Sequence, residues 1–255
     1  MNWNPEIYNQ FKDIRYQPFY DLMNFITPEE IRNAIDIGCG TGEQTFILAN
    51  QLKNAQFIGV DSSQAMLAES KQFVQERLSF KQATTEDVLE SKQTWDLIFS
   101  NAALQWSDQH DKLFPKLIAL LNPQGQMAIQ MPMQSDNVLN QLLLELVDEE
   151  PFKSYLNGWK RESPLLSIDE YATIMFHAGL IHMQIIQKVY PIIAEHAQDL
   201  LDFISGSALI PYVDRLKGDQ KEEFIMEYKK RIDQKFTTFP AIYPFKRLLL
   251  YGRKP

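Results

Sequence analysis

The chain has 255 residues and a formal net charge of −8, with 45% hydrophobic and 23% charged residues. These proportions are those of an ordinary globular protein, and no stretch approaches the roughly 20 apolar residues that span a bilayer. The negative charge argues against general nucleic-acid binding, which draws its affinity from basic side chains. The single cysteine, Cys39, has no partner for an internal disulfide, which fits a reducing compartment. We therefore expect a cytoplasmic protein that binds neither nucleic acid nor membrane.

Short apolar runs alternate with helical patterns through the first half of the chain. Strands are predicted at 34–37, 56–61, 78–83, 95–100 and 126–131. Helices are predicted at 5–12, 18–25, 41–52, 63–75 and 110–121, with a turn at 122–125. Ser62 or Ser63 suits the N-cap of the fourth helix. Alternation at this spacing predicts an α/β protein with a parallel sheet that helices cover on both faces.

The pattern changes after residue 132. Residues 136–180 and 195–237 are predicted to be mainly helical, and further strands are predicted at 183–190 and 246–252. The whole is expected to be a doubly wound, mostly parallel seven-stranded sheet with a helical insertion. We expect one domain over 1–255: an N-terminal arm (1–30), a ligand-binding core (31–135), a helical cap (136–240) containing one core strand near 183–190, and a final core strand (241–255). The cap is expected over the carboxyl ends of the strands, where open α/β sheets bind ligands.

A glycine-rich loop joins the first predicted strand to the next helix, with the sequence Asp36-Ile37-Gly38-Cys39-Gly40-Thr41-Gly42. Glycine permits a tight turn and a close approach of backbone to ligand. The dinucleotide fingerprint would need its third glycine at position 43, where Glu43 stands, and no P-loop Lys follows. Asp61 ends the second strand, where an acid accepts hydrogen bonds from ribose hydroxyls. Loop and acid together predict a ribose-containing ligand that need not carry phosphate.

With this loop and acid, the sequence resembles the large family of Rossmann-like methyltransferases that depend on S-adenosyl-L-methionine. The resemblance implies that cofactor, its product S-adenosyl-L-homocysteine, and no metal. It implies that the loop glycines line the methionine and ribose part, that Asp36 orders the loop, and that Ser62 and Met66 flank the adenine. The implied cofactor-binding set is Tyr8, Arg15, Asp36, Gly38, Cys39, Gly40, Gly42, Asp61, Ser62, Met66, Ala83, Thr84 and Asn101.

The family often has an Asp after the third strand that binds the adenine amino group, and here that position is Thr84. The adenine contact is then expected from the backbone or from the Thr84 hydroxyl. Arg15 and Tyr8 are expected to close an N-terminal arm over the cofactor, with Arg15 near its carboxylate because Arg pairs with carboxylates. The alternative for Arg15 is a surface salt bridge.

Three further segments resemble the trans-aconitate methyltransferase branch of this family. They are Trp3-Asn4-Pro5 with Tyr8, Phe11 and Arg15; Asp96 to Trp106; and Leu120 to Gly125 continuing to Gln130-Met131-Pro132. The resemblance implies methyl transfer to a carboxylate oxygen of a small polycarboxylic acid, which gives a monomethyl ester. No side chain need act as general acid or base, because a carboxylate is already ionised at pH 7.

The same resemblance implies the residues around the acid. Asn101, Gln105 and Trp106 follow the fourth strand and are expected to position the reacting groups, although Trp106 could instead be a core residue. The substrate-binding set is Gln105, Trp106, Arg161 and Arg247, since carboxylates need cations; the alternative for either arginine is a solvated surface charge. The branch usually has an Arg before the proline at 211, where this chain has Ile210, which points to another preferred acid.

Two alternatives stay open. The same fold and cofactor could act on a carboxyl of a carrier protein or on another small-molecule oxygen or nitrogen, or the chain could be a cofactor-binding regulator. A monomer or small homo-oligomer is expected. Cys39 is interpreted as a packing group. The four histidines are interpreted as structural or surface residues; they are His110, His177, His182 and His196.

Overall fold

The computed structural model describes residues 12–255. These residues form two compact units. The sheet unit consists of Pro18–Pro132, Pro164–Lys188 and Arg247–Pro255. The helical unit consists of Met133–Ser163 and Val189–Lys246, together with the described residues before Pro18.

A single seven-stranded sheet has the order β3-β2-β1-β4-β5-β7-β6. Its strands are β1 (Asn33–Ile37), β2 (Gln56–Asp61), β3 (Leu78–Gln82), β4 (Trp95–Asn101), β5 (Leu121–Pro132), β6 (Ile181–Ala194) and β7 (Ala241–Arg253). The first five strands are parallel, and β7 is antiparallel to β5. The prediction of a doubly wound, mostly parallel seven-stranded sheet is confirmed.

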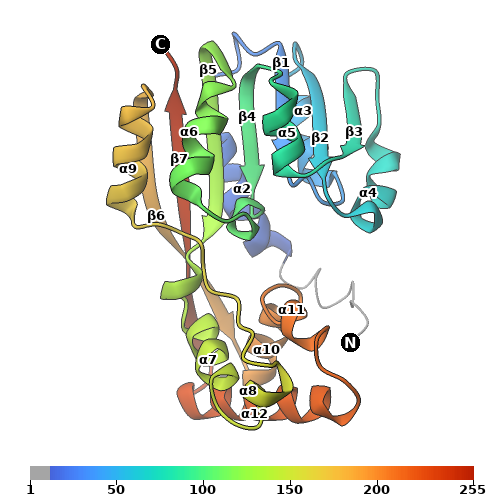
Figure 1. The fold of residues 1–255 in the computed structure, drawn as a ribbon, viewed down its shortest axis with the longest axis vertical. Coiled ribbons are helices and arrows are strands. Elements are labelled where there is room, and N and C mark those ends of the chain that lie inside the picture. Colours follow the sequence, from blue (N-terminus) through green and yellow to red (C-terminus); the bar gives the residue numbers. More distant parts are fainter. Residues whose placement is uncertain (1–11) are drawn as a thin grey trace. The chain divides into compact units, whose positions relative to one another are not determined.

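Helices cover both faces of the sheet unit, with α5 and α6 in front of the strands and α2 behind them in Figure 1. The helices of this unit are α2 (Lys12–Met23, which begins in the other unit), α3 (Glu43–Gln51), α4 (Gln64–Ser70), α5 (Thr85–Ser91), α6 (His110–Ala119) and α9 (Ile168–His177), with short 3-10 turns η1 (Lys71–Phe73) and η2 (Leu104–Trp106). On β4, Leu97, Ile98 and Phe99 are all fully buried. A continuous apolar run of this kind is what a strand covered on both faces requires.

Several predicted elements have different ends in the structure. The helix predicted at 18–25 begins at Lys12, and residues 5–11 of the helix predicted at 5–12 lie outside the described residues. Helix α5 was missed by the sequence analysis. Residues 122–125, predicted as a turn, instead belong to β5, whose pairing with β4 is irregular there: Trp95 pairs with Leu121, and Leu97 already pairs with Gln126. The strand therefore starts five residues earlier than predicted, at Leu121 instead of 126.

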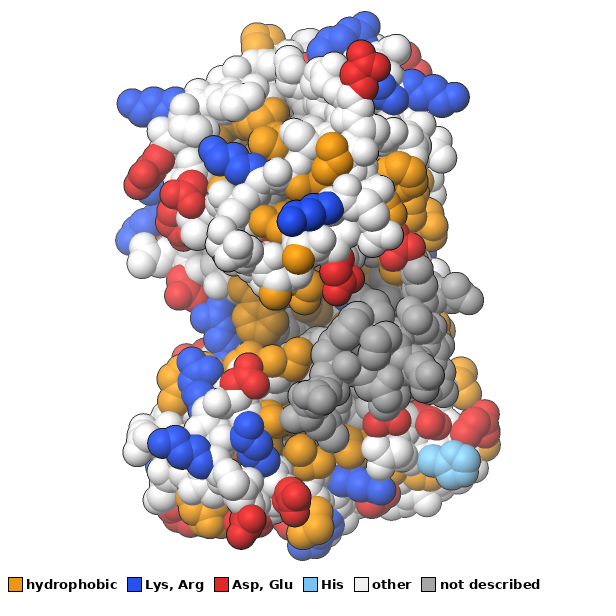
Figure 2. Space-filling view, turned by 90° about the vertical axis from the view of Figure 1, so that its right-hand side faces the viewer, with side chains coloured by type: hydrophobic (Ala, Val, Ile, Leu, Met, Phe, Trp, Pro, Cys, Tyr) orange, Lys and Arg blue, Asp and Glu red, His pale blue; other side chains and the backbone are white. Residues whose placement is uncertain are grey.

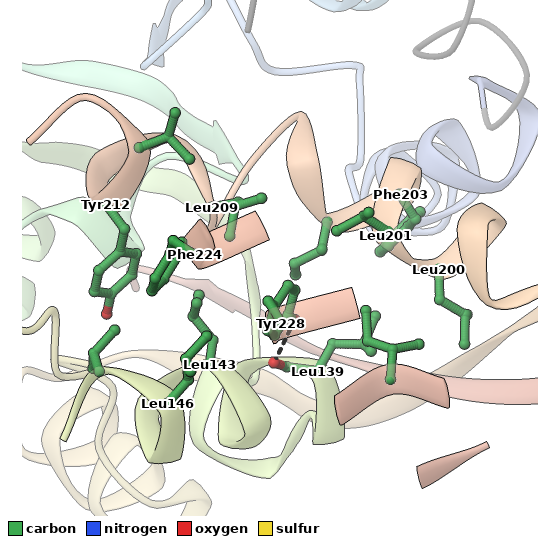
Figure 3. Packing of buried hydrophobic residues seen from close by; sticks show 14 of the residues in the cluster. Leu139, Leu143, Leu146, Leu200, Leu201, Phe203, Leu209, Tyr212, Phe224 and Tyr228 are labelled. Atoms are coloured by element: carbon green, nitrogen blue, oxygen red, sulfur yellow. Dashed lines mark hydrogen bonds between the residues drawn. The ribbon is translucent and has the colours of Figure 1, made fainter. Parts of the chain in front are cut away.

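The helical unit has a hydrophobic core of its own. Its elements are η3 (Gln134–Asp136), α7 (Val138–Val147), α8 (Phe152–Tyr155), α10 (Ala197–Ser205), α11 (Ile210–Val213) and α12 (Asp219–Lys235), with the adjoining parts of β6 and β7. Leu143 of α7 and Phe224 of α12 are buried in this core (Figure 3). Within it, the Tyr228 hydroxyl donates a hydrogen bond to the Leu139 carbonyl at 2.8 Å. The helices predicted on either side of the strand near 183–190 are thus confirmed.

The surface shows no separation of charge on the face drawn in Figure 2, where basic and acidic side chains are interspersed. Within residues 12–255, no helix combines the length and apolar character that crossing a membrane would take.

Candidate active site

The carboxyl edge of the sheet unit contains the point where the order of strands reverses. Strand β1 has β2 on one side and β4 on the other. Loops that leave neighbouring strands in opposite directions create a crevice at such a point, and ligands of open α/β sheets bind there. The loops after β1, β2 and β4 therefore define the candidate site.

The glycine loop after β1 packs tightly at one end and is open in its middle. Gly38 and Gly40 have φ angles of 76° and 56°, in the left-handed region that favours glycine. A Cβ on Gly38 would lie 2.1 Å from the Ala103 Cβ, so only glycine lets this loop contact the segment after β4. A Cβ on Gly40 would meet no described atom within 4 Å. The backbone at Gly40 is therefore accessible to a ligand.

Asp61, at the end of β2, holds this loop in place. Its Oδ2 accepts a hydrogen bond from the Gly40 backbone N–H at 2.9 Å, and its Oδ1 accepts one from the Ser63 N–H at 2.8 Å. A carboxylate has about four acceptor positions. Each oxygen of Asp61 therefore keeps a further lone pair, and the pair of oxygens suits two neighbouring hydroxyl donors.

Two buried groups lie at the glycine loop, the carboxyl group of Asp36 and the thiol of Cys39. Asp36 accepts a hydrogen bond from the Thr45 hydroxyl at 2.6 Å, and burial raises the pKa of its carboxyl to about 7. The Cys39 thiol is buried beside the carboxylates of Asp36 and Asp61, and burial together with these charges raises its pKa. A thiol that stays protonated is a poor nucleophile, so Cys39 acts here as a packing group.

The residues expected near the adenine lie on the exposed side of the loops after β2 and β3. Ser63, rather than Ser62, caps α4, since its Oγ accepts a hydrogen bond from the Met66 N–H. Thr84 caps α5, and its hydroxyl and backbone N–H both bind the Asp87 carboxylate at 3.0 and 2.8 Å. An adenine contact through either group of Thr84 would have to be shared with Asp87. Ala83 lies just before this cap and is half-buried.

The segment after β4 carries the predicted positioning residues. The Asn101 Nδ2 donates to Gln44 Oε1 of α3 at 2.9 Å, and the Gln105 Nε2 donates to the Ala102 carbonyl at 2.7 Å. Gln105 is buried, whereas Trp106 is 44% exposed. The alternative that Trp106 is a core residue is therefore wrong.

A buried histidine fixes the same segment. The Nε2 of His110 lies 3.0 Å from the Leu104 carbonyl, and its Nδ1 lies 2.5 Å from the Tyr171 hydroxyl. Because a carbonyl only accepts, Nε2 carries the proton, and in the neutral ring Nδ1 accepts from Tyr171. The expectation that His110 is structural holds, and its partner Tyr171 was not anticipated from the sequence.

Of the two predicted substrate arginines, Arg247 belongs to the carboxyl edge of the sheet unit. It pairs with Pro132, the last residue of β5, and its Nη1 donates to the Gln130 Oε1 at 3.1 Å. Arg247 is only 8% exposed. The alternative of a solvated surface charge is therefore wrong for Arg247.

The remaining predicted residues belong to the helical unit or to α2, or lie outside the described residues. Arg161 belongs to the helical unit, where its backbone N–H donates to the Tyr212 hydroxyl at 3.0 Å. Nearby in the same unit, the Arg215 guanidinium lies 3.6 Å over the Trp159 ring. Arg15 lies in α2, and Tyr8 falls outside the described residues.

Comparisons with known proteins identify the family of the chain. The family model of the methyltransferase domain matches residues 29–196. The trans-aconitate 2-methyltransferase of Deinococcus radiodurans is 36% identical over 261 residues, which cover 100% of this chain and 99% of that protein. The enzyme of the same name from Variovorax paradoxus is 32% identical, with 99% of this chain and 96% of that protein covered.

Solved structures agree on the fold. Phosphoethanolamine N-methyltransferase 2 of Haemonchus contortus, in complex with S-adenosyl-L-methionine, superimposes with a TM-score of 0.57 at 19% identity. The alignment covers 94% of this chain but about half, 52%, of that one. The fold is thus the one that solved Rossmann-like methyltransferases have. The chain belongs to the methyltransferase domain family and, within it, to the family of the trans-aconitate 2-methyltransferases.

Proposed function

We propose that this chain transfers the methyl group of S-adenosyl-L-methionine to a carboxylate oxygen of a small polycarboxylic acid, giving a monomethyl ester and S-adenosyl-L-homocysteine. The observation that carries the proposal is the hydrogen bond between Asp61 and Gly40 at the carboxyl edge, on a sheet unit whose same edge holds the buried Arg247. Asp61 and Gly40 suit an adenosyl ligand, and Arg247 suits an acid. The similarity to full-length relatives of that activity supports the same acceptor class.

The described residues fit the cofactor in three respects. Asp61 has acceptor positions left for the two ribose hydroxyls, and the Gly40 backbone is open to close approach. The Asn101 Oδ1 is buried and has no hydrogen-bond partner among residues 12–255, so it suits the ammonium group of the methionine part. When bound, the cofactor supplies a sulfonium whose methyl carbon is electrophilic.

The acid needs orientation rather than deprotonation. Carboxyl groups have ordinary pKa values near 4, so the attacking oxygen is ionised at pH 7 without a general base. Arg247 is proposed to bind a carboxylate, in the paired geometry that guanidinium and carboxylate groups favour. Gln105 and Trp106 are proposed to line the acceptor side of the methyl group. Alignment of the reacting atoms in a water-poor site can contribute about 7–11 kcal/mol to lowering the barrier.

The identity of the acid is the finer part of the proposal. Arg161 is proposed as a second carboxylate-binding residue on the strength of the family resemblance. Ile210 stands where the resembled branch has an arginine, so we propose a preference that differs from that branch, toward an acid with fewer or differently placed carboxylates.

A panel experiment tests this function. The purified chain is incubated with S-adenosyl-L-methionine and one of several di- and tricarboxylic acids, trans-aconitate among them. Formation of S-adenosyl-L-homocysteine and of base-labile methyl esters with at least one acid is expected. Cofactor binding in calorimetry without turnover of any acid would contradict the proposal and favour a regulator or another acceptor.

A further inference from the structure

We propose that Gln130 is a substrate-specificity residue: its Oε1 holds the Arg247 guanidinium in place, and its Nε2 donates a hydrogen bond to a carboxylate of the acid. This inference rests on the proposed function, because it assumes that the acceptor is a small acid. It concerns residues of the sheet unit alone.

Gln130 is a polar residue in an apolar stretch of β5. Its neighbours Ala128, Ile129 and Met131 are fully buried, and Gln130 itself is 0% exposed. Its Nε2 has no hydrogen-bond partner among residues 12–255. Buried side-chain donors without a partner are uncommon in native proteins because they are costly. The unpartnered Nε2 of Gln130 therefore indicates a ligand that supplies the missing hydrogen-bond acceptor.

The orientation of this amide is set by chemistry. Amide oxygen and nitrogen are hard to tell apart by shape, but an arginine side chain can only donate hydrogen bonds. Since the Arg247 Nη1 lies 3.1 Å from the end of Gln130, the atom that faces it must be the oxygen. The Nε2 is therefore the atom that points away from Arg247.

The position of Gln130 places this donor toward the candidate site. Gln130 is paired with Asn101 on β4, and its carbonyl accepts a hydrogen bond from the Ala102 N–H at 2.9 Å. Side chains of directly paired residues project from the same face of a sheet. Gln130 thus lies on the face of Asn101, with β4 on one side and Arg247 of β7 on the other.

The charge of this group selects an anion. A guanidinium and an adjacent N–H donor match the two oxygens of a carboxylate, whereas they would repel a cation. Both the acid and the methionine part of the cofactor carry a carboxylate. We assign the group to the acid, because Asn101, with its own unpartnered buried acceptor, stands between Gln130 and the glycine loop.

A second buried glutamine on the same strand provides a contrast. Gln126 is 1% exposed, and its Oε1 accepts hydrogen bonds from the Thr27 N–H and the Tyr251 hydroxyl at 2.8 and 2.9 Å. Its Nε2 donates to the Thr27 carbonyl at 2.7 Å. The amide of Gln126 is therefore satisfied within the protein, and it serves as a purely structural reference for Gln130.

The test compares Gln130→Glu and Gln130→Met with Gln126→Met in the full chain, with trans-aconitate and the best acid of the panel as probes. Gln130→Glu keeps the shape but replaces the donor by a second acceptor and neutralises Arg247. We expect the KM for the acid to rise at least about tenfold, as for a lost hydrogen bond to a charged group. The affinity for S-adenosyl-L-homocysteine should change less than about twofold. Gln130→Met should raise the KM for the acid as well, and it replaces Gln130→Glu in the test if the glutamate variant fails to fold.

Gln126→Met should lower the melting temperature and leave the KM for the acid unchanged. An unchanged KM in the folded Gln130 variants would overturn the inference. A loss of S-adenosyl-L-homocysteine affinity equal to the rise in KM would also overturn it, because the carboxylate would then be that of the cofactor. If the unsubstituted chain methylates no acid at all, the proposed function itself fails, which is a separate result.

Discussion

Asp61 and Gly40 come from successive strand ends and are joined by a hydrogen bond of 2.9 Å, in which the carboxylate accepts and the loop backbone donates. The same carboxylate binds the Ser63 N–H at the start of the next helix. One side chain thus fixes two loops before any ligand arrives. A site that is ordered in advance loses less conformational freedom on binding.

Substitution Asp61→Ala should weaken the binding of S-adenosyl-L-homocysteine by about 1.5–3 kcal/mol, the range for a lost hydrogen bond to a charged group. This corresponds to roughly a tenfold to hundredfold rise in Kd, which calorimetry can measure. Asp96→Ala is a matched control. Its carboxylate likewise accepts backbone hydrogen bonds, from Arg32 and Asn33, but at the opposite edge of the sheet. Equal losses of affinity in both variants would show that Asp61 is a structural residue only.

Gly40 and Gly158, two of the open glycines with positive φ, allow the effect of backbone strain to be separated from the effect of blocking a ligand. Gly40 and Gly158 have φ angles of 56° and 69°, and neither would bring a Cβ within 4 Å of a described atom. Alanine at either position should cost about 1–2 kcal/mol of stability, since the left-handed region is strained for an L-residue. Only Gly40→Ala should also abolish measurable S-adenosyl-L-homocysteine binding. Full binding by a folded Gly40→Ala variant would place the ligand elsewhere.

The sequence predicted those parts of the site that are local in the chain. The glycine loop and Asp61 each follow a short apolar strand, so their place at the carboxyl edge follows from the alternation of elements. The contact between Arg247 and Gln130 could not be derived in this way, because it joins residues 117 positions apart through the antiparallel β7. Helix α5 was missed because its start depends on the Thr84–Asp87 capping box rather than on a long apolar pattern.

The buried Asp36 should make stability depend on pH. Its pKa is raised from 3.8 to about 7 in the folded protein, so between these values the folded state retains a proton that the unfolded chain has lost. Stability then falls as the pH rises through this window and is lowest, for this group, above pH 7. Asp36→Asn cannot ionise, and its amide oxygen can still accept from Thr45. The difference in the free energy of unfolding between this variant and the unsubstituted chain, measured with urea, should grow in favour of the variant from about pH 4 to 7 and then level off. If the free energies of unfolding of the two proteins change with pH in the same way, then the ionisation of Asp36 does not destabilise the folded state.

The hydroxyl of Tyr171 should matter for the segment that carries Gln105 and Trp106. It binds His110, whose other ring nitrogen lies 3.0 Å from the Leu104 carbonyl at the start of η2. Tyr171→Phe deprives the imidazole of this donor and should lower the free energy of unfolding by about 1–3 kcal/mol.

Because η2 is then less firmly held, kcat/KM for the acid should fall while the affinity for S-adenosyl-L-homocysteine changes little. Tyr251→Phe provides the control, since the Tyr251 hydroxyl also binds a buried side chain, but this side chain is Gln126 of β5 and not a residue that holds η2. It should lower stability without a comparable effect on kcat/KM. If both variants reduce kcat/KM equally at a temperature where both are folded, then general loosening of the sheet unit, and not the tether through His110, accounts for the change.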